Sequence, residues 1–283
     1  MSTQGKRAWL AFKRRRSAVV GAVLVGFLVL AGVFGPLLAP YDPDERHAGF
    51  EEHPPSAQFW FGTDELGRDL FSGVIYGARV TLLVGCISVG LALSVGLVLG
   101  SISGYLGGRV DLFLQRVVDV MMSFPSILLA ILIVALTEKP SLTMAMVAVG
   151  IVGIPTYTRL VRATVLQQRE QEYVTAAKAM GASTPRILIR GILPNIVAPV
   201  TVQATLGFAT AILEAAGLSF LGLGAQPPTK EWGLMVKAGW DTWSTSPWII
   251  TFPGACIFVA VLSLNLLGDG LRDVLDPRQR GPG

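Results

Sequence analysis

The feature that most constrains this chain is a series of long apolar runs that are almost free of charge. Charged residues make up only 15% of the chain, against about 25% in soluble domains, so a soluble protein is excluded. About 20 helical residues, at 1.5 Å each, cross the hydrocarbon core of a bilayer. We therefore predict an all-α, polytopic membrane protein with six transmembrane helices. The runs lie at residues 17–39, 80–105, 117–137, 141–157, 196–221 and 248–267.

The basic residues before the first run allow a second reading of it, as a secretory signal. A signal's apolar segment is about 7–15 residues long and ends in a small-residue cleavage site. The run at 17–39 has 23 residues, which is long enough to span. We predict an uncleaved first helix that follows a cytoplasmic segment at residues 1–16.

The distribution of lysine and arginine predicts which loops lie inside. Placing the N-terminus, a turn at 109–116, the loop at 159–190 and the tail in the cytoplasm puts 17 of the 23 basic residues there, as the positive-inside tendency requires. The segment from 41 to 76 holds eight acidic residues and is placed outside. The expected division is therefore an external loop at 40–79, a five-helix core at 80–272 with a cytoplasmic loop at 159–195, and a cytoplasmic tail at 273–283.

A polar stretch at 170–199 interrupts the apolar runs and predicts two short helices with a corner between them. The first helix, about 171–180, stops at Gly181, a residue type that tolerates the left-handed C-terminal position. The second begins with Thr184 as its cap and Pro185 at the first helical position. The knob thus formed has a small-residue face that fits another protein's groove, composed of Ala176, Ala177, Ala179 and Ala182.

This stretch resembles the cytoplasmic EAA loop of ABC-importer permeases, which in that family docks onto the ATPase subunit. Ala176-Ala177, Gly181 and Leu193-Pro194 carry the resemblance, whereas Thr175 replaces the motif's leading Glu and Gly191 an apolar residue. The nearby acids Glu170 and Glu172 are candidates to replace that Glu. A basic amphipathic loop lying on the bilayer is the alternative reading. The resemblance implies a coupling site made of Glu172, Thr175, Ala176, Ala177, Gly181, Pro185, Leu193 and Pro194.

Residues 61–70, FGTDELGRDL, resemble a signature of the permeases for di- and oligopeptides and for nickel. Its glycines and paired acids predict tight turns in which Asp64, Arg68 and Asp69 pair locally. A structural role is favoured over substrate contact. The signature residues are Asp64, Glu65, Gly67, Arg68 and Asp69. The glycine-rich stretch at 215–228 and the ending at 269–278 resemble the same family.

Two features inside the apolar runs carry further predictions. A small residue occurs at every fourth position from Ser88 to Gly108, which is typical of a helix-packing face in lipid. Glu214 is the exception to the scarcity of charge, and an ionisable residue inside a membrane indicates function. Because it lies about 27 Å along a straight helix from Ile196, we expect it near the outer interface, either as an outer gate or as a local cap or ion-pair partner.

The tryptophans at 232, 240, 243 and 248 predict interfacial anchors in an external loop. The two histidines, His47 and His53, share the first external loop without a cysteine beside them. Zinc binding there is one reading, and solvated loop residues are the favoured one. We predict no metal site and no catalytic residue in this chain.

The family resemblance implies a permease subunit of an ATP-driven importer in a bacterial or archaeal cytoplasmic membrane, with both termini in the cytoplasm. The sequence contains no G-x-x-x-x-G-K-[ST] phosphate loop, so ATP and Mg²⁺ are expected on a partner ATPase and no cofactor here. The implied partners are the lipid bilayer, a second homologous permease, two ATPase subunits and an external substrate-binding protein, without nucleic acid. Peptides, glutathione and nickel chelates all fit as substrates.

Two rival classes compete with this interpretation. A secondary transporter driven by an ion gradient tends to carry intramembrane acids or broken helices near the midplane. Pro125 and Pro155 are the main interruptions of the runs, and the midplane is nearly free of charge. An integral membrane enzyme needs a converging polar constellation, which the sequence does not offer. The ABC permease is therefore the favoured class, with the ion-driven carrier as its alternative.

Overall fold

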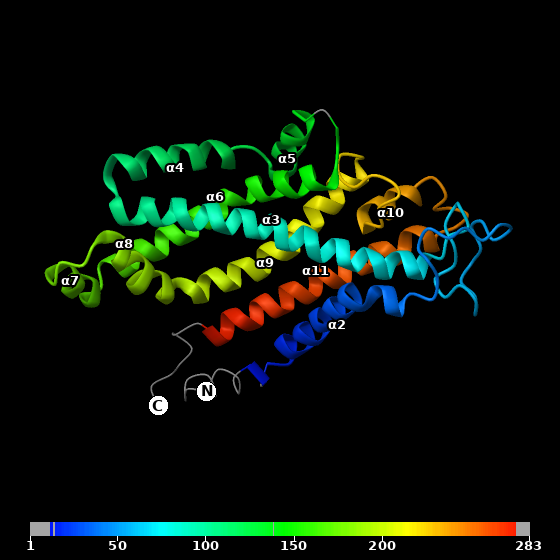
Figure 1. Ribbon diagram of the computed structural model, residues 1–283, viewed down its shortest axis with the longest axis horizontal. Helices are drawn as coiled ribbons and strands as arrows, with labels where there is room; N and C mark the ends of the chain where they lie inside the picture. The colour runs from blue at the N-terminus through cyan, green and yellow to red at the C-terminus, as the bar shows by residue number, and fades with distance from the viewer. Residues whose placement is uncertain (1–11, 14, 138, 276–283) are drawn as a thin grey trace.

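The computed structural model describes residues 12–13, 15–137 and 139–275, and its regular elements are helical (Figure 1). The basic residues at 6, 7 and 14 and the ending from residue 276 lie outside the described residues. In chain order the elements are α2 (Arg16–Leu38), α3 (Leu70–Leu106), α4 (Gly108–Met122), α5 (Ser126–Ala135), α6 (Leu142–Arg169), α7 (Glu172–Ala179), α8 (Thr184–Arg186), the π-helix η1 (Ile187–Ile192), α9 (Leu193–Phe220), α10 (Trp232–Ala238) and α11 (Trp248–Leu275).

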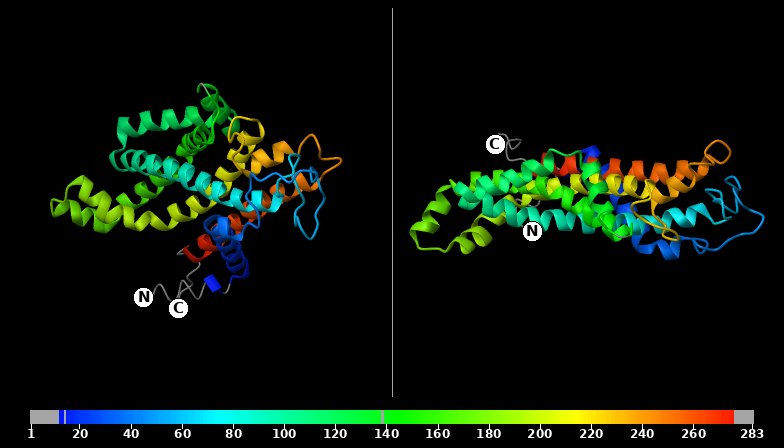
Figure 2. Two further views of the ribbon diagram at one scale, coloured as in Figure 1. Left: turned by 45° about the vertical axis from the view of Figure 1, so that its right-hand side comes forward. Right: turned by 90° about the horizontal axis from the view of Figure 1, so that it is seen from above.

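The helices form an elongated bundle with a different polar region at each end. In all views the loops around α10 and before α3 lie at one end, and α7 lies at the opposite end (Figures 1 and 2). The first residue of α2 and the last turn of α11 lie side by side, because Arg15 forms a 3.0 Å ion pair with Asp273. Both point toward the end that carries α7.

Five helices are long and apolar enough to cross a membrane: α2, α3, α6, the continuous helix Thr184–Phe220, and α11. The sixth predicted span, at 117–137, is not one straight helix. Helices α4 and α5 meet at an angle of 91° across a short break that contains Pro125, a residue that cannot continue a helix without a kink. The expected cytoplasmic turn at 109–116 is wrong, because these residues belong to α4.

The long helices extend beyond the apolar runs that predicted them. Helix α3 begins at Leu70, ten residues before the expected boundary at 80, and its 37 residues correspond to about 55 Å. Helix α6 continues to Arg169 rather than stopping at 157. Apolarity marks only the part of a helix that faces lipid, whereas the helix ends are fixed by caps. The Asp69 side chain caps α3 by accepting from the Ser72 amide at 2.8 Å.

The small-residue stripe of α3 packs against α6, as predicted. A Cβ atom added at Gly100 would lie 2.7 Å from both the Thr158 carbonyl oxygen and the Val161 Cβ atom. Gly96 and Gly104 face α6 equally closely. Such contacts are possible only where the helix backbones approach without side chains between them. Gly108 does not belong to this face, since it has a φ of +59° and open space around it.

Candidate functional site

The knob at the α7 end of the bundle begins with a short helix that ends in a left-handed corner. Gly181 has a φ of +75°, as predicted. The Ala182 amide donates to the Ala177 carbonyl at 3.0 Å, and the Gly181 amide donates to the Lys178 carbonyl at 2.9 Å. These two bonds form a Schellman motif, which satisfies the last carbonyls of α7.

A small apolar core fixes the knob to the long helices. Val174 of α7 is fully buried, and it belongs to one cluster with Ile187 and Ile192 of η1 and Val161 and Val165 of α6. Polar contacts add to this anchoring. The Tyr173 hydroxyl lies 2.9 Å from the Gln168 Oε1 atom and 3.4 Å from the Asn195 Nδ2 atom. The knob is therefore one rigid piece with the ends of α6 and α9.

The second half of the knob differs from the expected short helix. Helix α8, η1 and α9 run on without a break into the membrane span. Ser183, not Thr184, occupies the N-cap position and makes no side-chain capping bond, while Pro185 lies in the first turn as expected. The π-helix ends at Ile192, two residues before Pro194. A proline lacks an amide and its ring clashes with the carbonyl four residues earlier, and the wider π turn is one way to accommodate both.

The face that the knob presents to its surroundings is only partly the predicted one. Ala176 and Ala179 are exposed, but Ala177 and Ala182 are half-buried and pack on the apolar core under α7. Met180, which the sequence did not mark, is 81% exposed at the tip. A thioether side chain of this kind is soft and adaptable at binding surfaces. The remaining coupling residues are exposed except the half-buried Leu193: Glu172, Thr175, Gly181, Pro185 and Pro194.

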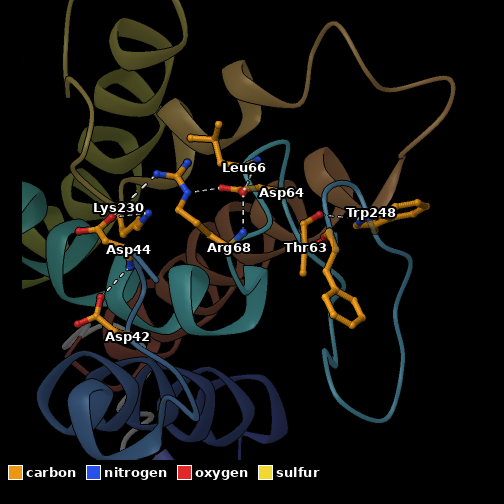
Figure 3. A network of polar contacts seen from close by, with 9 residues as sticks. Asp42, Asp44, Thr63, Asp64, Leu66, Arg68, Lys230 and Trp248 are labelled. Atoms are coloured by element: carbon orange, nitrogen blue, oxygen red, sulfur yellow. Dashed lines mark hydrogen bonds and ion pairs between the residues drawn. The ribbon is translucent and has the colours of Figure 1, made fainter. Parts of the chain in front are cut away.

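At the opposite end, the predicted signature residues form a tight turn (Figure 3). The Arg68 Nε atom donates to the Asp64 Oδ2 atom at 2.6 Å, and the Asp64 Oδ1 atom accepts from the Leu66 and Arg68 amides. Gly67 has a φ of +71°. The expected pairing of Asp69 with Arg68 is not seen, because the Asp69 carboxylate caps α3 instead.

Charges and hydrogen bonds tie this turn to the later external segments. Lys230 and Arg68 approach the same oxygen of Asp44, at 2.9 and 4.0 Å, and the Trp248 Nε1 atom donates to the Thr63 carbonyl (Figure 3). Glu65 stays exposed. Partial burial raises the pKa of Glu65, and the nearby carboxylates of Glu52, Asp64 and Asp241 raise it further. These contacts give the signature a role in joining the loops at this end of the bundle.

Two sequence interpretations of residues at this end of the bundle need correction. Trp232 is not an interfacial anchor, because its indole is buried and donates to the Val74 carbonyl at 2.9 Å. His47 and His53 are not solvated, since both are half-buried and pack against the fully buried ring of Phe59. Within residues 15–137 and 139–275, no group of three or more His, Cys, Asp or Glu residues could hold a metal ion.

Glu214 lines a cavity of about 270 Å³ between α3, α5, α6 and α9, which contains several polar side chains. It lies six residues before the end of α9, about 9 Å of helix, and interacts with the Ser126 side chain at the start of α5. No local ion pair is recorded for Glu214 in the described part of the chain. The other polar residues that line the cavity are Ser88, Thr156, Tyr157, Gln203 and Thr210.

A second, larger hollow of about 730 Å³ lies toward the knob, between α6, α9 and α11. Gln203 lines both spaces. Tyr157 lies beside Gln203, and two glycines, Gly96 and Gly207, leave space for its side chain. A Cβ atom at Gly96 would lie 2.5 Å from the Tyr157 Cβ atom, and one at Gly207 only 2.2 Å from the tyrosine oxygen. The two hollows therefore follow one another along α9, and the polar side chains that α9 contributes to this polar path are Glu214, Thr210, Gln203 and Asn195.

Comparison with known proteins assigns this bundle to a class of membrane transport components. A family model described as the binding-protein-dependent transport system inner membrane component matches residues 96–281, which is more than half of the chain. The chain belongs to this family. Residues 3–55 also match the N-terminal transmembrane domain of oligopeptide transport permease C. The protein is thus a multi-pass membrane component of a transporter, and the predicted fold class and family resemblance are confirmed.

Several relatives resemble the chain over nearly its whole length. The dipeptide transport system permease protein DppC of Alkalihalophilus pseudofirmus is 47% identical, with 97% of this chain and 90% of the relative covered. DppC of Escherichia coli K12 is 46% identical over 95% of this chain and 92% of the relative. The glutathione transport system permease protein GsiD of Escherichia coli is 42% identical over 96% and 90%. These relatives are transport permeases rather than enzymes.

A solved structure of the MetNI methionine ABC transporter in inward-facing conformations shares the fold. Its TM-score is 0.61 at 18% sequence identity, with 73% of this chain and 98% of that chain covered. The likeness shows that the two chains share a helical fold.

Proposed function

We propose that this chain is the permease subunit of an ATP-driven importer that carries di- or oligopeptides across a bacterial or archaeal cytoplasmic membrane. The relatives named above, which are dipeptide and glutathione permeases, support the substrate class. The observation that carries the proposal is the knob at residues 172–194, because it is rigidly joined to α6 and α9, both of which line the polar path. A partner that moves the knob also moves the walls of the path.

The proposed mechanism is rigid-body coupling. Closure of two ATPase subunits on MgATP displaces α7 and the Gly181 corner, and the buried contacts of Val174 transmit the displacement to α6 and α9. The two hollows on either side of Tyr157 then open to opposite sides in turn. ATP and Mg²⁺ bind the partner ATPase, and this chain holds no cofactor.

The proposed assembly contains a second homologous permease, two ATPase subunits and an external binding protein that delivers the peptide. The knob and both termini face the cytoplasm in this arrangement. Two observations support this orientation. Basic residues predominate near α7, and the 3.0 Å ion pair between Arg15 and Asp273 holds the start of α2 and the end of α11 together. The acidic turn at 61–70 then lies outside, where the binding protein approaches.

Co-purification with the ATPase subunits tests the coupling role of the knob. Gly181→Asp places a side chain at a left-handed position and a charge on the docking face, while Met180→Glu changes only an exposed tip. Both variants are expected to insert normally and to lose ATPase binding or peptide-stimulated hydrolysis, whereas Met180→Leu retains them. If Met180→Glu and Gly181→Asp both keep full stimulated hydrolysis, the knob is not the coupling element.

A second candidate function is an ion-driven carrier. The observations in its favour are the partly buried carboxylate of Glu214 in a polar cavity and the broken span between α4 and α5. Both features are typical of secondary transporters. The family match and the knob favour the ATP-driven importer instead.

A further inference from the structure

The polar cavity around Glu214 is lined by a negative charge and by no positive charge. Among the residues that line it, Glu214 carries the only formal charge, and every other polar group is a hydroxyl or an amide. The ion pairs recorded for the described residues do not include Glu214. A carboxylate inside a membrane protein normally has a cationic or hydrogen-bonding partner. Ser126 lines the same cavity and interacts with Glu214, and among the lining residues there is no cation.

The break between α4 and α5 places the start of a helix at the cavity that Glu214 lines. Pro125 ends the turn before α5, so Ser126 is the first residue of a ten-residue helix. The amides of a first helical turn have no carbonyl partners and favour a nearby anion. Ser126 and Glu214 line the same cavity, so the start of α5 lies on the side of the cavity where it favours an anion. One side of the carboxylate remains available to the cavity.

We propose that Glu214 holds the protonated amino group of the transported solute, so that the cavity selects molecules that carry a primary ammonium. The inference rests on the proposed function, because it assumes that solute passes along α9. A free amino terminus is the cation that every unmodified peptide carries. The ammonium pairs with Glu214, and the neutral groups of Thr210 and Gln203 along the same helix face line the space for the rest of the molecule.

The charge preference of the cavity can be measured without transport or binding protein. Thr210→Cys places a thiol one helical turn from Glu214, in a chain whose exposed Cys86 and half-buried Cys256 are replaced by alanine. The assembled complex is treated with a cationic ethyltrimethylammonium methanethiosulfonate and with its anionic ethylsulfonate counterpart. The ratio of the two reaction rates, normalised to a small thiol in buffer, reports the local preference for a cation.

We expect Glu214→Gln to lower this ratio by about tenfold or more, since one unit charge at this range in a partly wet site shifts the free energy of a cation by more than about 1.4 kcal/mol. Glu214→Asp, which keeps the charge, should retain most of the preference. Glu45→Gln, an identical substitution on an exposed external residue, should leave the ratio unchanged. An equal ratio in the wild-type chain and in Glu214→Gln overturns the proposal.

Uptake into proteoliposomes gives a second readout, with alanyl-alanine as the probe. In the reconstituted complex, Glu214→Gln should reduce the initial uptake rate about tenfold or more, Glu214→Asp should restore most of it, and Glu45→Gln should have no effect. If the wild-type complex takes up no peptide, the proposed function fails, whatever ratio of the two thiol reaction rates is measured. If it takes up peptide and Glu214→Gln does so equally fast, only the ammonium site is refuted.

Discussion

The close contact between α3 and α6 makes a quantitative prediction for two glycines of the same helix. In Gly100→Ala, the new Cβ atom would lie 2.7 Å from the Thr158 carbonyl oxygen and 2.7 Å from the Val161 Cβ atom. Neither neighbour is a flexible side-chain end, so the helices must separate. Such overpacking costs about 1–3 kcal/mol. In Gly90→Ala nothing lies within 4 Å of the new atom, and alanine should stabilise the helix by about 0.5–1 kcal/mol.

The gain in helix propensity is common to both substitutions, so their free energies of unfolding should differ by the overpacking cost of about 1–3 kcal/mol. The assay is thermal and denaturant unfolding of the purified protein in detergent, after both variants are shown to insert at wild-type levels. Because each substitution adds the same methyl group to one helix, helix propensity is matched, and the two positions differ in that Gly100 is buried and Gly90 is exposed. Equal stability of Gly100→Ala and Gly90→Ala would refute the packing described for α3 and α6.

Three further predictions concern the ion pairs and turns. Arg162→Lys should lose one of the two bonds from Arg162 to Asp111, at 2.5 and 2.7 Å, and reduce unfolding free energy by about 1 kcal/mol, whereas Arg159→Lys in its exposed pair should stay within about 0.5 kcal/mol. Gly181→Ala should cost about 1–2 kcal/mol in unfolding measurements through its left-handed backbone alone, since no atom lies within 4 Å. The folded pKa of Glu65 is raised from 4.5, so its stabilising contribution is present below that pH and is lost as pH rises through the raised value. Glu65→Gln should therefore raise the unfolding temperature at about pH 7 and not at about pH 4, and a pH-independent effect would contradict this.

The sequence predicted the helical architecture because lipid restricts what can cross it. Long uncharged runs located five of the spans, and the spacing from Ser88 to Gly104 predicted a helix-packing face, whose partner the structure identifies as α6. The bent pair α4–α5 was missed. Residues 109–116 look like a charged turn in the sequence, but Asp111 and Arg162 neutralise each other across two helices. The two residues are 51 positions apart in the sequence, so patterns among neighbouring residues cannot predict that they pair.

The candidate sites were predictable to different degrees. The Gly181 corner follows from local backbone chemistry, and the structure confirms it. The orientation of the knob depends on tertiary packing, so Met180 was overlooked and Ala177 was expected to be exposed. Glu214 was singled out by its charge alone. The cavity that it faces is assembled from four helices, and no local pattern in the sequence indicates that Tyr157 fits between Gly96 and Gly207.

The central claim is that ATP hydrolysis by partner subunits drives peptide uptake through this chain. The direct test is uptake of labelled alanyl-alanine into proteoliposomes that contain the assembled complex, with binding protein and peptide on one side and MgATP on the other. The expected result is uptake that requires ATP and persists when ionophores have collapsed the proton and sodium gradients. Uptake that follows an imposed ion gradient without ATP would contradict the claim and establish the ion-driven carrier in its place.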